Sequence, residues 1–252
     1  MAASWYARAA TALVAALALM AGCGLGDDGD TPEPTPTPSP TSPPPGSPRS
    51  PTAPATPPAD GGDDTVREDV EAAVRVTDAY WSKHWGDLFT GSYQPPRLLG
   101  AYDGATPPVP GCAGEALPDD NAVYCPAGDY VAWDLDLMSR GHQAGDAWVY
   151  LVIAHEWGHA IQQRLSAELV SRAAELQADC LAGAALFGAE RDGTLRFEEG
   201  DTQELNQALT ALADETPWTD TTDHGDAGER IAAFDKGARS GVTACLPEDA
   251  LR

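Results

Sequence analysis

Residues 147–163 read AWVYLVIAHEWGHAIQQ, and this stretch has the clearest structural pattern in the chain. Apolar side chains such as Val149 and Val152 recur in it at the spacing of three and four residues that is typical of a helix. Asp146 stands directly before it, where a residue that caps a helix is expected. The pattern therefore predicts a helix over residues 147 to about 165.

Two histidines and a glutamate in this predicted helix form a candidate metal site. His155 and His159 are one helical turn apart, so both imidazole rings project from one face, as two ligands of one tetrahedral zinc ion require. Glu156 lies on the same side, rotated by roughly 60° from His159. This place suits a general base that acts on a zinc-bound water without being a ligand. The alternative is a helix whose histidines have no common role.

The segment ELQAD, residues 175–179, provides a candidate third ligand. A catalytic zinc ion has three protein ligands and an open fourth position. Glu175 and Asp179 share one helix face, so Glu175 can bind zinc while Asp179 supports a ligand histidine. The pair alone is equally typical of two solvated carboxylates, but its place on the next predicted helix favours ligation. Cys180 lies about 100° further round that helix and suits a disulfide better than a ligand.

The remaining pattern predicts one α+β domain, mostly helical, with a small sheet near its N-terminal part. Short apolar runs between turn residues predict strands, and longer runs with helical spacing predict helices. Strand Tyr130–Asp134 is either an edge strand that pairs with an extended substrate or an ordinary sheet strand. The other predicted strands are Arg97–Tyr102 and Ala122–Cys125, and the other predicted helices cover residues 65–85, 166–187, 203–213 and 228–239.

The charge of the chain excludes some classes of partner. With 15 basic and 39 acidic residues among 252, the formal net charge is −24. Nucleic-acid binding needs clustered Lys and Arg, and electrostatic docking onto anionic lipids needs a basic surface, so we expect neither. The acidity is otherwise explained by solubility.

The N-terminus has the pattern of an export signal. Arg8 precedes an apolar run that is too short for a membrane span of roughly 20 residues, and the run ends in Met20-Ala21-Gly22-Cys23. Two small residues before a cysteine resemble a bacterial lipobox, so we expect residues 1–22 to be a lipoprotein signal peptide and Cys23 to be lipidated. The alternative is ordinary secretion with an incidental Cys23. Both place the protein outside the cytoplasm.

A segment rich in Pro, Thr and Ser follows Cys23. Such sequences cannot form a core and extend as polyproline II. We expect residues 23–64 to be a disordered tether that reaches on the order of 100 Å. It would hold a folded domain, residues 65–252, on the outer side of the membrane, anchored through Cys23.

Several other residues are candidates for lesser roles. Four cysteines beside Cys23 are an even number in an exported chain and predict two disulfides, with three possible connectivities. His224 is a candidate for stabilising a developing oxyanion, or else a loop histidine paired with a neighbouring aspartate. His84 and His142 are expected to be structural or surface residues.

Together these motifs resemble a bacterial family of neutral zinc metallopeptidases. The resemblance lies in AWVYLVIAHEWGHAIQQ, in ELQADCLAG at residues 175–183 and in VYCPAGDYVAWDLDLM at residues 123–138. His224-Gly225, Arg230 and Cys245 are similar to the C-terminal pattern of that family.

The resemblance implies a zincin-like fold with one zinc ion on His155, His159 and Glu175, and with Glu156 as the base. It implies the disulfides Cys112–Cys125 and Cys180–Cys245. The implied function is hydrolysis of protein or peptide substrates outside the membrane. The alternatives are a catalytically silent zinc-binding lipoprotein that acts as a scaffold or binding module, and a metal-scavenging lipoprotein.

Overall fold

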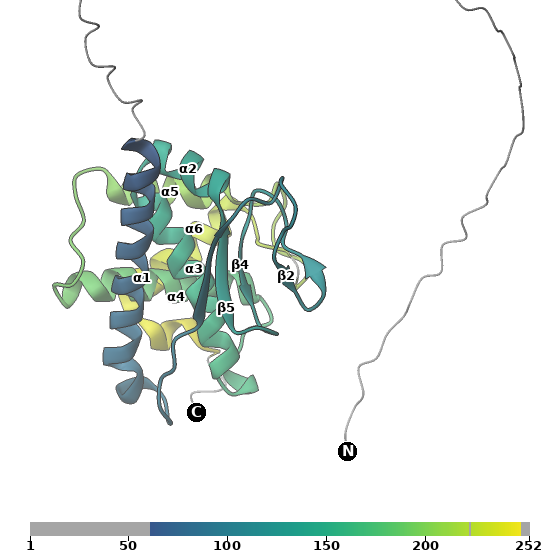
Figure 1. Ribbon diagram of the computed structural model, residues 1–252. Coiled ribbons are helices and arrows are strands. Elements are labelled where there is room, and N and C mark those ends of the chain that lie inside the picture. The colour runs from purple at the N-terminus through teal and green to yellow at the C-terminus, as the bar shows by residue number, and fades with distance from the viewer. Residues whose placement is uncertain (1–60, 222, 248–252) are drawn as a thin grey trace, which may run out of the picture. The chain divides into compact units, whose positions relative to one another are not determined.

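The computed structural model describes residues 61–221 and 223–247, with the backbone alone for residues 61–64. The signal and lipidation predictions, and the tether prediction up to residue 60, lie outside this part. Residues 61–64, which were also predicted to belong to the disordered tether, are instead the first turn of helix α1 (Gly61–Leu88). In it, a body of helices packs beside a small sheet near the N-terminal part of the fold (Figure 1). This confirms the predicted α+β class. Among the described residues, no helix combines the length and the apolar character that crossing a membrane requires.

The helices are α1 (Gly61–Leu88), α2 (Leu135–Ala144), α3 (Ala147–Arg164), α4 (Ala174–Arg191), α5 (Asp201–Ala211) and α6 (Ala227–Ser240), and two short 3-10 helices are η1 (Ala167–Leu169) and η2 (Val242–Cys245). The strands are β1 (Arg97–Tyr102), β2 (Gly111–Cys112), β3 (Glu115–Ala116), β4 (Ala122–Cys125) and β5 (Tyr130–Asp134). The longest connection between the elements is residues 212–226, between α5 and α6.

The helix predicted over residues 166–187 begins later than expected. Only η1 forms before α4, which starts at Ala174. The side chain of Gln177 explains the break, because it accepts a hydrogen bond from the Ser171 N–H and donates one to the Leu169 carbonyl. These backbone groups are therefore satisfied outside a helix.

Asp134 and Asp226 cap helices through their side chains, whereas Asp146, the predicted capping residue, does not. Asp146 has helical backbone angles and its side chain makes no capping hydrogen bond, so the expectation for α3 was wrong. The buried Asp134 accepts from the N–H groups of Asp136 and Leu137 and so starts α2 at the end of β5. Asp226 forms a capping box with Glu229 at the start of α6.

The main sheet has the order β1-β5-β4, with β5 parallel to β1 and antiparallel to β4. The strand Tyr130–Asp134 is therefore central. Of the two alternatives for it, the ordinary sheet strand is confirmed and the edge strand is wrong. Its five residues are all buried, because both its edges and both its faces are covered. β4 is an edge strand instead.

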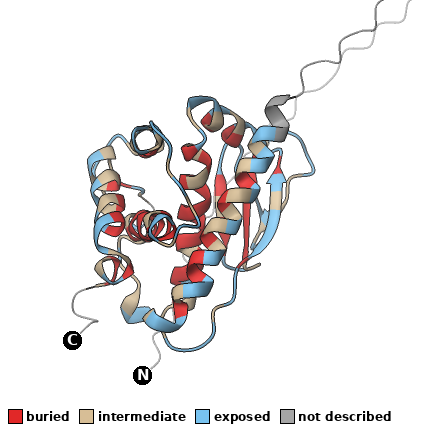
Figure 2. Cartoon of the chain, turned by 90° about the vertical axis from the view of Figure 1, so that its left-hand side faces the viewer, coloured by how far each residue is buried: buried red, intermediate tan, exposed pale blue. Residues whose placement is uncertain are grey.

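The two faces of β5 belong to different apolar clusters. Val131 and Trp133 pack in the large cluster with α1, α3 and α4. Tyr130 and Ala132 point the other way, toward Tyr102 and Leu117 in the segment that precedes β4. Figure 2 shows buried residues running through the middle of the molecule, where α3 and α4 lie. The helix that carries the two histidines is thus held from several sides.

α4 lies between α3 and α6, and glycines allow both close approaches. A Cβ atom on Gly158 of α3 would lie 2.9 Å from the Ala178 carbonyl oxygen of α4. A Cβ atom on Gly237 of α6 would lie 1.8 Å from the Cys180 carbonyl oxygen. The disulfide Cys180–Cys245 joins α4 to the segment after α6, and a second disulfide joins Cys112 to Cys125.

We predict that Gly237→Ala destabilises the protein by about 1–3 kcal/mol, because the added methyl group forces α4 and α6 apart. Gly86→Ala in α1 is the matched control, since a Cβ there meets nothing within 4 Å. It should stabilise the protein by roughly 0.4–1 kcal/mol. Urea denaturation measures both, and equal effects of the two changes would contradict the close contact of α4 with α6.

Candidate metal centre

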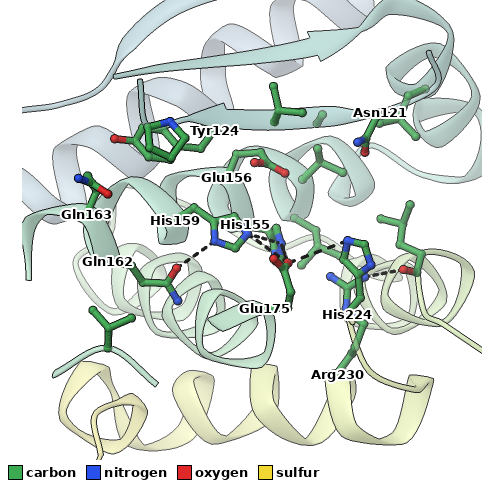
Figure 3. A pocket seen from close by; sticks show the side chains of 18 residues that line it. Asn121, Tyr124, His155, Glu156, His159, Gln162, Gln163, Glu175, His224 and Arg230 are labelled. Carbon is green, nitrogen blue, oxygen red and sulfur yellow. Dashed lines mark hydrogen bonds and ion pairs between the residues drawn. The ribbon is translucent and has the colours of Figure 1, made fainter. Parts of the chain in front are cut away.

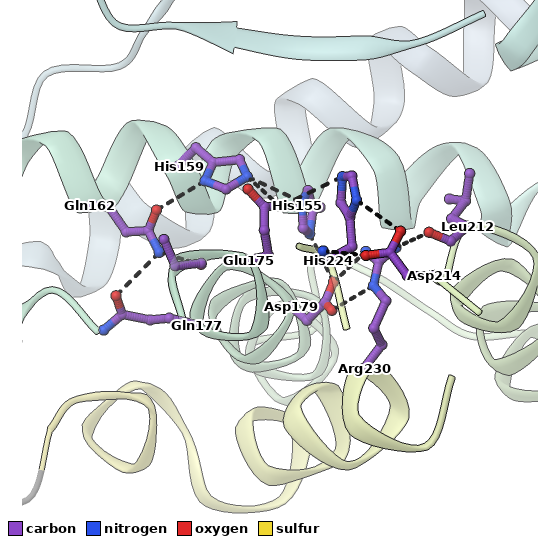
Figure 4. A network of polar contacts seen from close by, with 11 residues as sticks. His155, His159, Gln162, Glu175, Gln177, Asp179, Leu212, Asp214, His224 and Arg230 are labelled. Carbon is purple, nitrogen blue, oxygen red and sulfur yellow. Dashed lines mark hydrogen bonds and ion pairs between the residues drawn. The ribbon is translucent and has the colours of Figure 1, made fainter. Parts of the chain in front are cut away.

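Three side chains from α3 and α4 converge on one point. The Nε2 atoms of His155 and His159 are 3.2 Å apart, and each lies 3.2 Å from Oε2 of Glu175 (Figure 4). The three atoms therefore form an equilateral triangle. The helix places the two imidazoles on one face, and the contact at Gly158 brings the carboxylate of α4 to them.

This triangle fits zinc in size. Ligand nitrogen and oxygen atoms lie about 2.0–2.2 Å from a zinc ion, so two ligands of a tetrahedral ion are separated by about 3.3–3.6 Å. The observed separations of 3.2 Å are close to that value. Two imidazoles and one carboxylate are also the donor set of several catalytic zinc sites that keep one position open.

The charges around this triangle of ligand atoms also favour a cation. Burial alone raises the pKa of Glu175, but hydrogen bonds with His155 and His159 outweigh burial and hold the pKa well below its usual range. Burial alone lowers the pKa of His155, but the carboxylates of Asp179 and Glu175 outweigh it and raise the pKa to about 10. The site therefore attracts positive charge, either a proton or a metal ion.

A buried ion pair of Asp179 with Arg230 supports His155 on the side away from the metal-binding point. The Nδ1 atom of His155 lies 2.8 Å from Oδ1 of Asp179, whose side chain is fully buried. Arg230 of α6 donates two hydrogen bonds of 2.8 Å to the two oxygens of that carboxylate. Burial raises the pKa of Asp179, but Arg230 and His155 outweigh it, and the pKa stays below its usual range. Asp179 thus fixes the proton of His155 on Nδ1 and leaves Nε2 free for a metal.

Arg230 also donates a hydrogen bond to the carbonyl oxygen of Leu212, the residue that follows α5, so it connects α4 and α6 with the end of α5. The sequence did not predict that Arg230 pairs with Asp179. In the sequence, Arg230 was only one residue of the C-terminal family pattern. A single arginine carries no spacing signal that points to a carboxylate 51 positions earlier in the chain.

Glu156 lies beside the two histidines and lines a cleft of about 590 Å³ (Figure 3). It is 7% exposed, so its carboxylate is held largely out of water. The structure thus brings all four predicted residues of the centre, His155, Glu156, His159 and Glu175, to one cleft. Asp179 lies directly behind them.

His224 lies at the rim of the same cleft. Its Nε2 atom is 4.0 Å from Oε2 of Glu175, and its ring is about half exposed. Asp214 holds it, because the His224 N–H donates to Oδ2 of Asp214 at 2.7 Å and Nδ1 lies 3.6 Å from Oδ1. The aspartate neighbour is therefore Asp214 rather than the Asp223 or Asp226 that stand beside it in the sequence.

The walls of the cleft come from two kinds of surface. Edge strand β4 and the residues beside it form one wall, with Asn121, Tyr124 and Pro126 among them. Apolar side chains line another part, namely Leu137, Leu151, Val152 and Leu212. The cleft is thus lined by a strand edge and by aliphatic side chains around the convergent polar groups.

The other histidines lie away from the centre. Nε2 of His84 is 2.7 Å from Asp192, and Nε2 of His142 is 2.9 Å from Asp69, so both join helices as structural residues. Among the described residues, one further group of possible metal ligands exists, Asp146, Asp201 and Glu204. It consists of carboxylates alone and lacks the imidazoles that favour zinc.

We predict that Arg230→Met lowers the free energy of unfolding by about 3–5 kcal/mol, because it leaves the buried Asp179 carboxylate without its main partner. Adding Asp179→Asn should restore part of this loss, since the uncompensated charge is then removed. Arg239→Met is the control, because its partner Asp235 is exposed on the same helix and such pairs contribute under about 1 kcal/mol. Urea denaturation at neutral pH measures all of them, and similar losses for Arg230→Met and Arg239→Met would contradict the buried ion pair.

Comparisons with known proteins identify the family of this chain. The sequence profile of a family described as "Putative neutral zinc metallopeptidase" matches residues 41–173, which include His155 and His159 but end before Glu175. Two relatives are the "Uncharacterized protein YpfJ" of Escherichia coli K12 and that of Escherichia coli O6:H1. Each is 32% identical over 189 residues, which cover 62% of this chain and 63% of the relative.

The chain therefore spans less than two thirds of the length of these relatives. No solved structure gave a significant match. The family profile covers more than half of the 252 residues, and its matched segment contains the helix with both histidines. This chain thus belongs to the neutral zinc metallopeptidase family.

Proposed function

We propose that this protein hydrolyses peptide bonds with one zinc ion, outside the membrane. The observation that carries the proposal is the triangle of His155, His159 and Glu175 with the Glu156 carboxylate beside it in one cleft. The first three would hold the ion. A zinc ion there would supply Lewis acidity and lower the pKa of a water at its open position to about 7.

Glu156 acts as the general base in this proposal. It takes a proton from the attacking water and passes it to the nitrogen of the leaving amine. A glutamate that is only 7% exposed suits this task, because few waters compete for its carboxylate. Among the described residues, the Glu156 side chain forms no hydrogen bond or ion pair that would explain a carboxylate at this position.

His224 stabilises the carbonyl oxygen as it gains negative charge. It lines the same cleft as the two ligand histidines, with its Nε2 atom 4.0 Å from Oε2 of Glu175. Asp214 orients its ring through contacts with both the backbone N–H and Nδ1. An imidazole N–H aimed into the cleft can donate a hydrogen bond to such an oxyanion.

An extended peptide would lie along β4. This strand is at the edge of the sheet, and its residues line the cleft, so its free backbone groups can pair with a substrate strand. Tyr124 is held in place because its hydroxyl donates to Asp129, which also pairs with Arg164 at the end of α3. The wall is thereby fixed relative to the helix that carries the metal ligands.

A zinc-binding lipoprotein without turnover is the alternative. Such a scaffold needs the three ligands but neither the base nor an open cleft. The presence of Glu156 in a cleft of about 590 Å³ favours the hydrolase.

We predict that Glu156→Gln abolishes cleavage of a mixed peptide library while zinc content stays at about one ion per chain. Loss of a general base lowers the rate by about 100-fold or more. The full-length chain is compared with Glu190→Gln, an exposed glutamate in the last turn of α4, which should cleave like the wild type. His159→Ala should lose the zinc.

Equal cleavage by Glu156→Gln and wild type would refute the assigned base. No cleavage by the wild type in the presence of bound zinc would favour the scaffold. Unchanged zinc content in His159→Ala would mean that the metal lies elsewhere.

We also propose that residues 1–22 are a signal peptide, that Cys23 is lipidated and that residues 23–60 tether the domain that begins with α1 to the cell membrane. The proposal rests on the Ala21-Gly22-Cys23 sequence and on the proline-rich composition after it. Cys23→Ser should abolish incorporation of a labelled fatty acid and move the protein from the membrane to the soluble extracellular fraction. Retention of Cys23→Ser in the membrane would contradict the anchor.

A further inference from the structure

The Nδ1 atom of His159, on the side of the ring away from the metal-binding point, is contacted by an amide and not by a carboxylate. This atom lies 2.9 Å from Oε1 of Gln162, one turn further along α3. Gln162 is buried, with 8% of its surface exposed. His155 has a charged partner in Asp179, so the two ligand histidines are supported by different chemistry.

The direction of the Gln162 amide is determined by its other contacts. Its Nε2 atom lies 2.6 Å from the Ala174 carbonyl oxygen and 3.1 Å from Oε1 of Gln177. A reversed amide would place its oxygen against these two acceptors and its nitrogen against His159. The NH₂ group must therefore face Ala174, and Oε1 must face the imidazole.

The direction of the Gln177 amide is determined in turn by the backbone. Its Nε2 atom donates to the carbonyl oxygens of Leu169, at 2.8 Å, and Cys245, at 3.1 Å. Its Oε1 atom accepts from the Ser171 N–H at 2.9 Å. Backbone groups have a fixed donor or acceptor character, so they leave one orientation for Gln177 and, through it, one for Gln162.

We propose that Gln162 and Gln177 are positioning residues that form an amide relay, which holds His159 with its proton on Nδ1 and its Nε2 lone pair toward the metal. The inference rests on the proposed zinc site. The relay begins at backbone groups of the segment between α3 and α4 and of η2. It ends at a metal ligand through the contacts of Gln177 with Gln162 and of Gln162 with His159, which Figure 4 shows.

The relay has a consequence for the shape of the centre. The segment from Leu169 to Ser171 includes Val170, which lines the cleft. Cys245 is attached to α4 through its disulfide with Cys180. The amides of Gln162 and Gln177 therefore connect the ligand His159 with the cleft wall at residues 169–171 and with Cys245 of η2. Because both amides are neutral, they add no charge beside the zinc site.

The test measures zinc affinity of the full-length chain by competition with a chelator. Gln162→Met removes the acceptor at nearly constant side-chain volume and should weaken zinc binding by about 10- to 100-fold. Gln162→Glu should bind within a few-fold of wild type, because one oxygen still accepts from His159 while a protonated oxygen donates to Ala174. The zinc affinity of Gln177→Met should lie between those of Gln162→Met and Gln162→Glu, since Gln162 keeps its contact with the Ala174 carbonyl oxygen.

Gln163→Met is the matched control for zinc affinity. Gln163 is the next residue of α3 and is exposed. It should bind zinc like the wild type. Wild-type affinity in Gln162→Met would overturn the relay, and an equal loss in Gln162→Glu and Gln162→Met would do so as well.

A second measurement needs no variant and so does not depend on how well Gln162→Met folds. In the wild-type chain loaded with ¹¹³Cd and labelled with ¹⁵N-histidine, the metal should couple to Nε2 of His159, and the proton should be on Nδ1. Metal coupling to Nδ1 would overturn the relay. A wild-type chain that binds no metal would instead refute the proposed zinc site itself.

Discussion

The close packing of α3 against α4 creates the metal centre, and most other contacts around the centre maintain it. The metal-binding donors are divided between these helices, with two imidazoles on α3 and one carboxylate on α4. Gly158 lies between His155 and His159, and a Cβ atom there would lie within 3.1 Å of three atoms of Ala178. The glycine allows the backbones to approach until Glu175 lies 3.2 Å from both imidazole nitrogens.

Two different supports hold the histidines in this arrangement. A buried ion pair from α6 orients His155, and neutral amides orient His159. A buried carboxylate without partners is costly, so Asp179 depends on Arg230. α6 is in turn held against α4 at Gly237, and the Cys180–Cys245 disulfide closes the same side. Helix α6 and the short helix η2, which follow α4 in the chain, thus hold the metal-binding donors of α3 and α4 in place.

The sequence predicted the local part of this arrangement. One helical turn relates His155 to His159 and Glu175 to Asp179, and such spacing can be read from the chain directly. The partners that come from distant positions were not predicted. Arg230, Gln177 and Asp214 reach the centre through packing, which leaves no periodic signal. The place of strand β5 in the sheet stayed open for the same reason, because a short apolar strand can be central or lateral and only the pairing with β1 decides.

An anomalous difference map is the sharpest test of whether His155, His159 and Glu175 together hold one zinc ion. It needs a crystal of the zinc-loaded chain, measured on both sides of the zinc absorption edge. We expect one strong peak about equally distant from the two Nε2 atoms and Oε2 of Glu175. A peak only at Asp146, Asp201 and Glu204, or no peak between the two histidines, would contradict this zinc site.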